Sequence, residues 1–227
     1  MPTDSIWDFY LDNMEQYYFR GKRVLEIGSY HKFKGIRYFI EKYMKPSLYI
    51  GVDIIPGHNV DIVARLEDLL NIFSRVYFDV IILTEVMEHI KDYKLAVGII
   101  KKLLSDKGLV YITTRSYGFG IHYAPMDYWR FEMSDLQILF SDFNILQLKK
   151  DNQFPGIFLL ARKESQFDEN FAPVLKNGLY SILIGRRTSE IIEITQARTL
   201  IKLTFLLHKS SFKLLHFAGA VINHFII

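Results

Sequence analysis

Short apolar runs alternate with segments of helical period through most of this 227-residue chain. The apolar runs have the length and composition of buried strands, and we expect strands at 23–28, 48–53, 60–63, 78–83, 108–113, 143–149 and 155–162. The segments between them predict helices at about 35–44, 66–73, 92–104 and 134–141. Strands that alternate with helices need crossover connections, which produce a mostly parallel sheet with helices on both faces.

The last two predicted strands depart from this alternation, because only a short loop at 151–154 separates them. Strands joined so closely pair as an antiparallel hairpin. The sequence therefore predicts an α/β fold of the Rossmann-like type, with a doubly wound, mostly parallel, seven-stranded sheet and an antiparallel edge hairpin. In the helix before the hairpin, Ser134 and Gln137 have the spacing of a capping box.

The composition indicates one sizeable globular domain. Half of the residues are apolar, which is enough to fill one core, and cysteine is absent. The lack of cysteine excludes disulfides, thiolate nucleophiles and cysteine metal sites. The opening MPTDSIWDFY lacks the basic and apolar regions of a signal peptide, so we expect a cytoplasmic location.

Charge and apolar content divide the chain into three regions. Residues 1–21 have the amphipathic, aromatic pattern of an N-terminal helix, and residues 22–163 hold the alternating strands and helices. Residues 164–227 predict a helical, basic and apolar C-terminal extension. From Ala172 onward this extension carries seven Lys or Arg residues against two Asp or Glu residues, whereas the net charge of the whole chain is only +3.

Basic side chains in the extension recur along one stripe of a predicted helix. The stripe comprises Arg198, Lys202, Lys209, Lys213 and His216. The run 214–227 has no Lys or Arg, but it is shorter than the ~20 residues that span a bilayer. Two interpretations stay open: the helix packs on the domain or on a second copy in a homodimer, or it makes peripheral contact with an anionic membrane.

Side chains at the carboxyl ends of the first two predicted strands indicate a nucleoside site, because ligands of doubly wound sheets bind outside these ends. Glu26 and Gly28 end the first strand in VLEIGSYHKFKG, and a glycine there allows a ligand to approach the backbone closely. Asp53 ends the second strand, where such folds place a carboxylate that holds a ribose. An aspartate that only caps a turn is the alternative.

The fourth predicted strand runs into polar residues in FDVIILTEVMEHI. Glu85, Glu88 and His89 are of residue types that bind metals. However, the first turn after a strand rarely presents three such side chains inward, and the HExxH spacing of zinc enzymes is absent from the sequence. We therefore expect no metal site.

VLEIGSY, YIGVDI and FDVIILTEVMEHI, in this order and spacing, resemble the glycine loop, the acidic second strand and the fourth-strand motif of class I S-adenosylmethionine-dependent methyltransferases. GLVYITTRS resembles the fifth strand of the same family. The resemblance covers most of residues 22–163, and PGHNVDIV and HYAPMDYWRF are similar to a bacterial and archaeal subgroup near the type 11 methyltransferases. It implies S-adenosylmethionine as the cofactor.

The resemblance also implies contacts with this cofactor. Glu26 would order the ammonium of its methionine moiety, Gly28 would let the chain pass beneath that moiety, and Asp53 would hold the ribose. The other implied cofactor contacts are Ser29, Ile54, Leu66, Thr84 and Glu85. The chain departs from the family pattern in the glycine loop, where Tyr30 and Lys32 replace the later glycines.

The segment HYAPMDYWRF follows the fifth strand and gathers polar and aromatic side chains at the lip of the expected pocket. His122, Asp127 and His89 are the catalytic candidates, because an imidazole titrates near neutral pH and can take a proton from an oxygen acceptor. The candidate substrate contacts are Tyr128, Trp129 and Arg130. A lid packed by its own aromatic side chains, with Asp127 and Arg130 as an internal ion pair, is the alternative.

Together these features predict a methyltransferase with a small-molecule acceptor, with a sugar or a lipid-linked glycan as the favoured subtype. A catalytically inactive binding or scaffold protein of the same fold is the alternative, which the altered glycine loop favours. A nicotinamide-dependent dehydrogenase lacks support, because GxGxxG is absent and no Tyr-x-x-x-Lys pair stands at a suitable place. The small net charge and the lack of a basic stripe on the body argue against a nucleic-acid partner.

Overall fold

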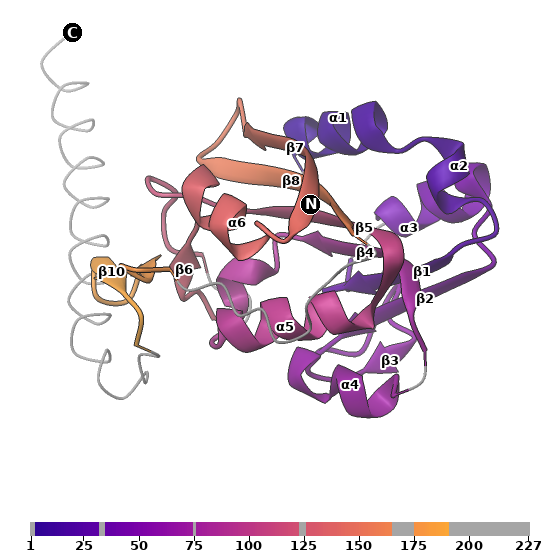
Figure 1. The fold of residues 1–227 in the computed structure, drawn as a ribbon, viewed down its shortest axis with the longest axis horizontal. Helices are drawn as coiled ribbons and strands as arrows, with labels where there is room; N and C mark the ends of the chain where they lie inside the picture. The colour runs from indigo at the N-terminus through magenta and orange to yellow at the C-terminus, as the bar shows by residue number, and fades with distance from the viewer. Residues whose placement is uncertain (1–2, 32–34, 75, 123–125, 165–174, 191–227) are drawn as a thin grey trace, which may run out of the picture.

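The computed structural model describes residues 3–31, 35–74, 76–122, 126–164 and 175–190. A seven-stranded sheet with the order β3-β2-β1-β4-β5-β8-β7 forms its centre (Figure 1). The strands are β1 (Arg23–Ile27), β2 (Leu48–Asp53), β3 (Ile62–Val63), β4 (Phe78–Thr84), β5 (Leu104–Arg115), β7 (Phe143–Lys150) and β8 (Gly156–Lys163). Strand β8 runs antiparallel to both neighbours, and the other six strands share one direction. The predicted doubly wound α/β fold with an antiparallel edge hairpin is confirmed.

Helices cover both faces of the sheet (Figure 1). They are α1 (Asp4–Asn13), α2 (Gln16–Phe19), α3 (Ile36–Phe39), the π-helix η1 (Ile40–Met44), the 3-10 helix η2 (Leu66–Asp68), α4 (Leu69–Ile72), the 3-10 helix η3 (Met87–His89), α5 (Tyr93–Leu103) and α6 (Met133–Leu139). The helices predicted at 35–44 and 66–73 each consist of two short pieces. Within the described ranges, no helix is long and apolar enough to cross a membrane.

The strands alternate their side chains between two apolar cores, one on each face of the sheet. In β4, Val80 and Ile82 pack with α1, α2 and α3, whereas Ile81 and Leu83 pack with α4, α5 and α6. All four side chains are fully buried. Because side chains of a strand point alternately to opposite faces, a strand covered on both sides is a continuous apolar run, as the sequence shows at 80–83.

Helix α6 has a capping box, but at a different place from the predicted one. Glu132 is the N-cap, its side chain accepts from the backbone of Asp135, and Asp135 Oδ2 accepts from the backbone N–H of Glu132 at 2.9 Å. The prediction of Ser134 and Gln137 is wrong, because Ser134 already lies inside the first helical turn. The buried Leu136 fixes which face of the helix is apolar, but it does not fix where the helix begins.

A second, three-stranded sheet connects the segment of the predicted substrate contacts to residues beyond the main domain. Its strands are β6 (Trp129–Arg130), β9 (Leu179–Ser181) and β10 (Arg186–Thr188), antiparallel and in the order β10-β9-β6. The prediction of a helical extension over 164–227 is therefore wrong for 175–190. There, Gly178 and Gly185 have φ of 64° and 68°, which favour turns over a continuous helix. The predicted basic stripe, homodimer contact and membrane contact depend on residues 191–227, which lie outside the described residues.

Candidate active site

The predicted site residues gather where β1, β2, β4 and β5 end. These strands are parallel, so their carboxyl ends lie along one edge of the sheet (Figure 1). Glu26 lies near the end of β1, and Asp53 and Thr84 are the last residues of β2 and β4. The loop after β5 brings His122 to the end of β4, where its Nε2 is 3.8 Å from Glu88. The edge that the sequence indicated is therefore where the polar side chains meet.

The loop after β1 turns at Gly28, whose φ of 76° lies in the left-handed region that favours glycine. A Cβ built at this position would lie 2.2 Å from Cγ2 of Val86, in the loop after β4. The N–H of Gly28 donates to the carbonyl of Val52 at 2.8 Å. A side chain at position 28 would push the two loops apart, so both the backbone and the packing require glycine here.

Glu26 is a buried carboxylate with one unpaired oxygen. Its Oε2 accepts a hydrogen bond from the Tyr49 hydroxyl at 2.8 Å, whereas its Oε1 has no hydrogen-bond partner among the described residues. Burial raises the pKa of Glu26 to about 8, although the hydrogen bond from Tyr49 opposes the rise. A buried acceptor without a donor is costly, and an ammonium group next to Oε1 would supply the donor.

Asp53 connects two loops through its carboxylate. Its Oδ2 accepts from the backbone N–H of Tyr30 and its Oδ1 from that of Ile55, both at 3.0 Å. The second contact is the turn cap that the sequence offered as the alternative role. Each carboxylate oxygen keeps a further lone pair, and Asp53 is only half-buried. The side chain is thus held in place and can still accept hydrogen bonds from a diol.

Three other predicted cofactor contacts differ in exposure. Ile54, next to Asp53, is 44% exposed. Leu66 is buried in the core, and Ser29 is fully buried, with its Oγ 2.7 Å from a Cβ built at Gly51. Ile54 therefore presents its side chain outward, whereas Ser29 and Leu66 contribute through packing.

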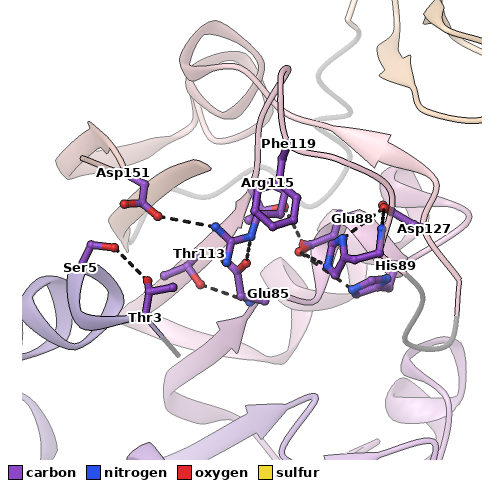
Figure 2. Close-up of polar contacts among 12 residues, drawn as sticks. Thr3, Ser5, Glu85, Glu88, His89, Thr113, Arg115, Phe119, Asp127 and Asp151 are labelled. Atoms are coloured by element: carbon purple, nitrogen blue, oxygen red, sulfur yellow. Dashed lines mark hydrogen bonds and ion pairs between the residues drawn. The ribbon is translucent and has the colours of Figure 1, made fainter. Parts of the chain in front are cut away.

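Helix α1 reaches the same strand ends through Tyr10. The Tyr10 hydroxyl and Thr84 Oγ1 form a hydrogen bond of 2.5 Å, and both residues are buried. Figure 2 shows Thr3 and Ser5, at the start of this helix, on the side of the site where Asp151 lies. The aromatic pattern of residues 1–21 indicated a packed helix, but nothing local in the sequence marks the contact with Thr84.

Glu85 and Arg115 form an ion pair across the ends of β4 and β5 (Figure 2). Nη1 of Arg115 also lies 3.6 Å from Oδ2 of Asp151. Burial raises the pKa of Glu85 to about 8; the carboxylate of Glu88 adds to the rise and Arg115 opposes it. The sequence does not mark Arg115 as a site residue, because its partners are distant in the chain.

Asp127 holds both Arg130 and His122. Nη1 and Nη2 of Arg130 donate to its two oxygens at 2.5 and 2.7 Å, and Nδ1 of His122 lies 3.1 Å from Oδ2. Burial alone would raise the pKa of Asp127, but the hydrogen bonds from Arg130 and His122 outweigh it and hold the pKa at about 2. The internal ion pair that the sequence offered as an alternative is thus present, and Asp127 acts as an anchor that stays ionised.

The predicted substrate contacts are largely buried. Trp129 and Arg130 are each 1% exposed, and Tyr128 is 9% exposed. Nε1 of Trp129 donates to the carbonyls of Ile90 and Lys91 at 3.0 and 3.1 Å. These side chains pack inside the protein beneath the surface of the site, so they offer little surface to an acceptor in this structure.

Glu88 brings two of the catalytic candidates together. Its Oε1 lies 4.0 Å from Nε2 of His89 and 3.8 Å from Nε2 of His122. The centroids of the two imidazole rings are 4.7 Å apart. Glu88 is fully buried. The sequence grouped it with Glu85 and His89, and the structure adds His122 to this neighbourhood.

The sheet is doubly wound and parallel except for one inserted antiparallel strand, and carboxylates lie at the ends of β1 and β2. This arrangement is typical of α/β domains that bind nucleosides. Residues 7–155 match a family of methyltransferase domains. The chain belongs to this family, the class I S-adenosylmethionine-dependent methyltransferases, whose cofactor is S-adenosylmethionine.

Solved methyltransferase structures share the fold. The N-methyltransferase NodS from Bradyrhizobium japonicum has a TM-score of 0.54 at 11% identity, over 72% of this chain and 98% of NodS. Its complex with S-adenosyl-L-homocysteine has a TM-score of 0.52 at 14% identity, over 70% and 87%. The 1,6-didemethyltoxoflavin-N1-methyltransferase from Burkholderia thailandensis, with 1,6-didemethyltoxoflavin and S-adenosylhomocysteine bound, has a TM-score of 0.51 at 19% identity, over 64% and 72%. A search of curated protein sequences gives no match.

Proposed function

We propose that this chain is an active S-adenosylmethionine-dependent methyltransferase with a small-molecule acceptor. The observation that carries the proposal is the pair of fixed carboxylates at the ends of the adjacent strands β1 and β2. Glu26, with its unpaired Oε1, suits the ammonium of the cofactor, and Asp53 suits the ribose diol. S-adenosylmethionine supplies a methyl group on a sulfonium, which leaves by in-line displacement.

The side chains around these carboxylates orient the reactants and exclude water. Tyr10 ties helix α1 to Thr84, so the helix covers one side of the strand ends. Gly28 and Val86 hold the loops after β1 and β4 against each other. Since the sulfonium is already a good leaving group, alignment and a dry site can provide much of the rate enhancement.

A base is needed only where the acceptor must lose a proton, and His122 is the favoured residue. Its Nδ1 faces Asp127, which leaves Nε2 to accept the proton, and Asp127 stabilises the imidazolium that forms. Arg130 fixes Asp127 and is therefore a positioning residue. His89, with Nδ1 at the carbonyl of Met126, is a second imidazole of the same kind.

Replacing Asp53 with Ala tests the cofactor site. We expect S-adenosylhomocysteine to bind more weakly by about 1.5 to 3 kcal/mol, the range for hydrogen bonds to a charged group, when measured by calorimetric titration. The matched control is Asp106→Ala, since Asp106 is exposed near the start of β5, away from the strand ends. Equal affinity of the Asp53→Ala variant and the wild type would remove Asp53 from the site.

A catalytically inactive binding protein is the second candidate, and Tyr30 is the residue that favours it. Its ring packs on Gly57, where a built Cβ would lie 2.4 Å from the ring, and it stands where the family pattern has one of the later glycines of the loop after β1. Titrations with S-adenosylhomocysteine and with NAD separate the candidates. Binding of the first alone supports the methyltransferase, and binding of neither supports the inactive protein.

The acceptor is proposed to be a small molecule, with a sugar or a lipid-linked glycan as the favoured subtype. The buried wall of Trp129 and Arg130 closes one side of the lip and restricts the room for a large acceptor. The structure of the Burkholderia thailandensis relative contains the small molecule 1,6-didemethyltoxoflavin. Methyl transfer from labelled cofactor to extracted small molecules and to protein fractions would rank these acceptor classes.

A further inference from the structure

Three acceptor atoms converge at the lip of the site. Oε1 of Glu88 lies 4.0 Å from Nε2 of His89 and 3.8 Å from Nε2 of His122, and the three residues offer ligand atoms that all lie within 4.8 Å of one another. Glu88 and His89 belong to η3, whereas His122 comes from the loop after β5. Figure 2 shows Glu88 and His89 close together beside Asp127. Only the tertiary fold brings these groups to one place.

Both histidines place their Nδ1 against a fixed acceptor. Nδ1 of His89 lies 2.5 Å from the carbonyl oxygen of Met126, which can only accept. Nδ1 of His122 lies 3.1 Å from Asp127, whose two oxygens also accept from Arg130. Each neutral ring therefore carries its hydrogen on Nδ1 and a lone pair on Nε2. A carbonyl or carboxylate partner of this kind orients most metal-binding histidines in proteins.

Glu88 supplies the third lone pair. Its Oε2 accepts a hydrogen bond from Oγ1 of Thr114 at 2.8 Å, which fixes the carboxylate. Its Oε1 has no hydrogen-bond partner among the described residues, and the side chain is fully buried. A buried carboxylate oxygen that faces two nitrogen lone pairs lacks a donor, and a cation at this point would satisfy all three atoms.

The charges around the three residues also suit a cation. The ionisable groups beside the two histidines are the carboxyl groups of Glu85, Glu88, Asp127 and Asp151 and the guanidinium groups of Arg115 and Arg130. Carboxyl groups thus outnumber guanidinium groups four to two in this cluster, so a cation there would have more acceptor oxygens than cationic groups around it. The side chain of His122 is 33% exposed, whereas those of His89 and Glu88 are 11% and 0% exposed, so an ion would enter past His122.

We propose that Glu88, His89 and His122 bind a divalent transition-metal cation through Oε1 and the two Nε2 atoms. Two imidazoles and one carboxylate form the ligand set of many catalytic zinc sites and of non-haem iron sites, which keep coordination positions open. Metal–ligand bonds of about 2.0 to 2.2 Å place the ligand atoms roughly 3 to 3.5 Å apart. The distances from Glu88 to the two histidines need to shorten by less than about 1 Å.

This site differs from the sequence-based expectation of no metal. That expectation considered Glu85 as the companion of Glu88 and His89. In the structure, Glu85 is paired with Arg115, and the third ligand is His122, which no local spacing connects to His89. The chain has no cysteine, so thiolate ligands are not available to it.

The metal site also narrows the acceptor class, in a step that rests on the proposed methyltransferase function. A bound ion at the lip would coordinate an acceptor oxygen and lower the pKa of its hydroxyl group. In the metal-loaded protein, Nε2 of His122 is a ligand rather than a base. Hydroxyl-bearing acceptors are therefore favoured over amines.

Metal binding by the full-length chain tests the site without any need for turnover. The chelator-treated protein is dialysed against micromolar Zn²⁺, and bound zinc is measured per chain; Co²⁺ is used in parallel for its visible d–d absorption. We expect one ion per chain, and at least about a tenfold loss of affinity in His89→Ala and in His122→Ala. The matched control is His58→Ala, because His58 is exposed in the loop after β2 and should not change the binding.

Glu88→Gln tests the third ligand, with circular dichroism to check that this buried position still permits folding. If it does not fold, His122→Ala decides the matter, since His122 is partly exposed. Less than one ion per wild-type chain, or equal affinity in wild type and His122→Ala, overturns the proposal. Titration with S-adenosylhomocysteine distinguishes the failure of this proposal from the failure of the proposed function. Loss of metal binding alone rules out the metal site, and loss of cofactor binding alone rules out the cofactor site.

Discussion

At the scale of single residues, Glu26 combines burial with an unpaired oxygen, and the two together make cofactor binding depend on pH. Its raised pKa of about 8 means that the free protein holds a proton on this carboxyl group at neutral pH. An ammonium group next to Oε1 favours the ionised form and lowers the pKa. Binding below pH 8 therefore releases a proton, and the affinity should increase with pH, by at most about tenfold per pH unit.

Calorimetric titration with S-adenosylhomocysteine at pH 7, in two buffers that differ in ionisation enthalpy, measures this proton release. We expect the wild type to release close to one proton and the Glu26→Gln variant to release none. The variant Glu15→Gln is the control, because Glu15 is exposed before α2. Equal heats in the two buffers for the wild type would argue against a protonated Glu26.

Asp127 and Arg130 form a buried ion pair whose loss should affect stability strongly. Asp127→Ala would leave the guanidinium of Arg130 buried without its carboxylate, at a cost of about 3 to 5 kcal/mol in the free energy of unfolding. The double variant Asp127→Ala/Arg130→Met should be more stable than Asp127→Ala alone, because it removes the unpaired charge. Urea unfolding measures both. If the double variant is no more stable than the single one, Arg130 has other essential partners, such as the carbonyls of Phe119 and Gly120.

At the scale of elements, helix α1 is held by aromatic packing on the sheet. Phe9 is fully buried, and its ring centroid lies 5.1 Å from that of Phe158 and 6.3 Å from that of Tyr111. We expect Phe9→Ala to lower the free energy of unfolding by about 3 to 5 kcal/mol, as for other large side chains removed from a core. Leu11→Ala, at a position that is 53% exposed in the same helix, should change it by less than about 0.5 kcal/mol. Similar effects of the two substitutions in urea unfolding would contradict the observed packing.

The short β9–β10 hairpin shows how an element outside the main sheet supports the lip. The backbone N–H of Ile182 donates to the carbonyl of Tyr128 at 3.0 Å, and Arg187 forms an ion pair with Asp135. Strand β9 also pairs with β6. The hairpin therefore braces the segment that carries Asp127 and Arg130, which a helix at 175–190 would not do through backbone pairing.

At the scale of the whole molecule, the cofactor should stabilise the fold, because its proposed contacts come from several strand ends. S-adenosylhomocysteine at about 100 times its Kd adds about 2.7 kcal/mol to the free energy of unfolding. For a chain of this size, this corresponds to an increase in Tm of about 5 to 11 °C. Differential scanning calorimetry measures the increase, and Asp53→Ala at the same concentration should show a smaller one. An equal increase with NAD would point to a different nucleotide site.

The sheet shows how much of the architecture is written in local patterns. The continuous apolar run at 80–83 and the short loop at 151–154 predicted the buried strand β4 and the β7–β8 hairpin, and the structure confirms both. These features depend on the two-residue period of a strand and on the short reach of a tight loop, which are properties of neighbouring residues. Local patterns were less reliable at boundaries: the capping box of α6 lies at Glu132 and Asp135, because several pairs near the helix start share the same spacing.

The sequence by itself determined the doubly wound sheet, the strand ends that carry Glu26 and Asp53, and the segment that carries His122 and Asp127. Only the tertiary structure decided the partner of each polar side chain. It paired Glu85 with Arg115, placed His122 next to Glu88, and turned Trp129 and Arg130 into the protein. The physical reason is that burial along a strand or helix repeats with a fixed local period. The partner of a buried charge is instead chosen by which distant segments the fold brings within hydrogen-bond distance.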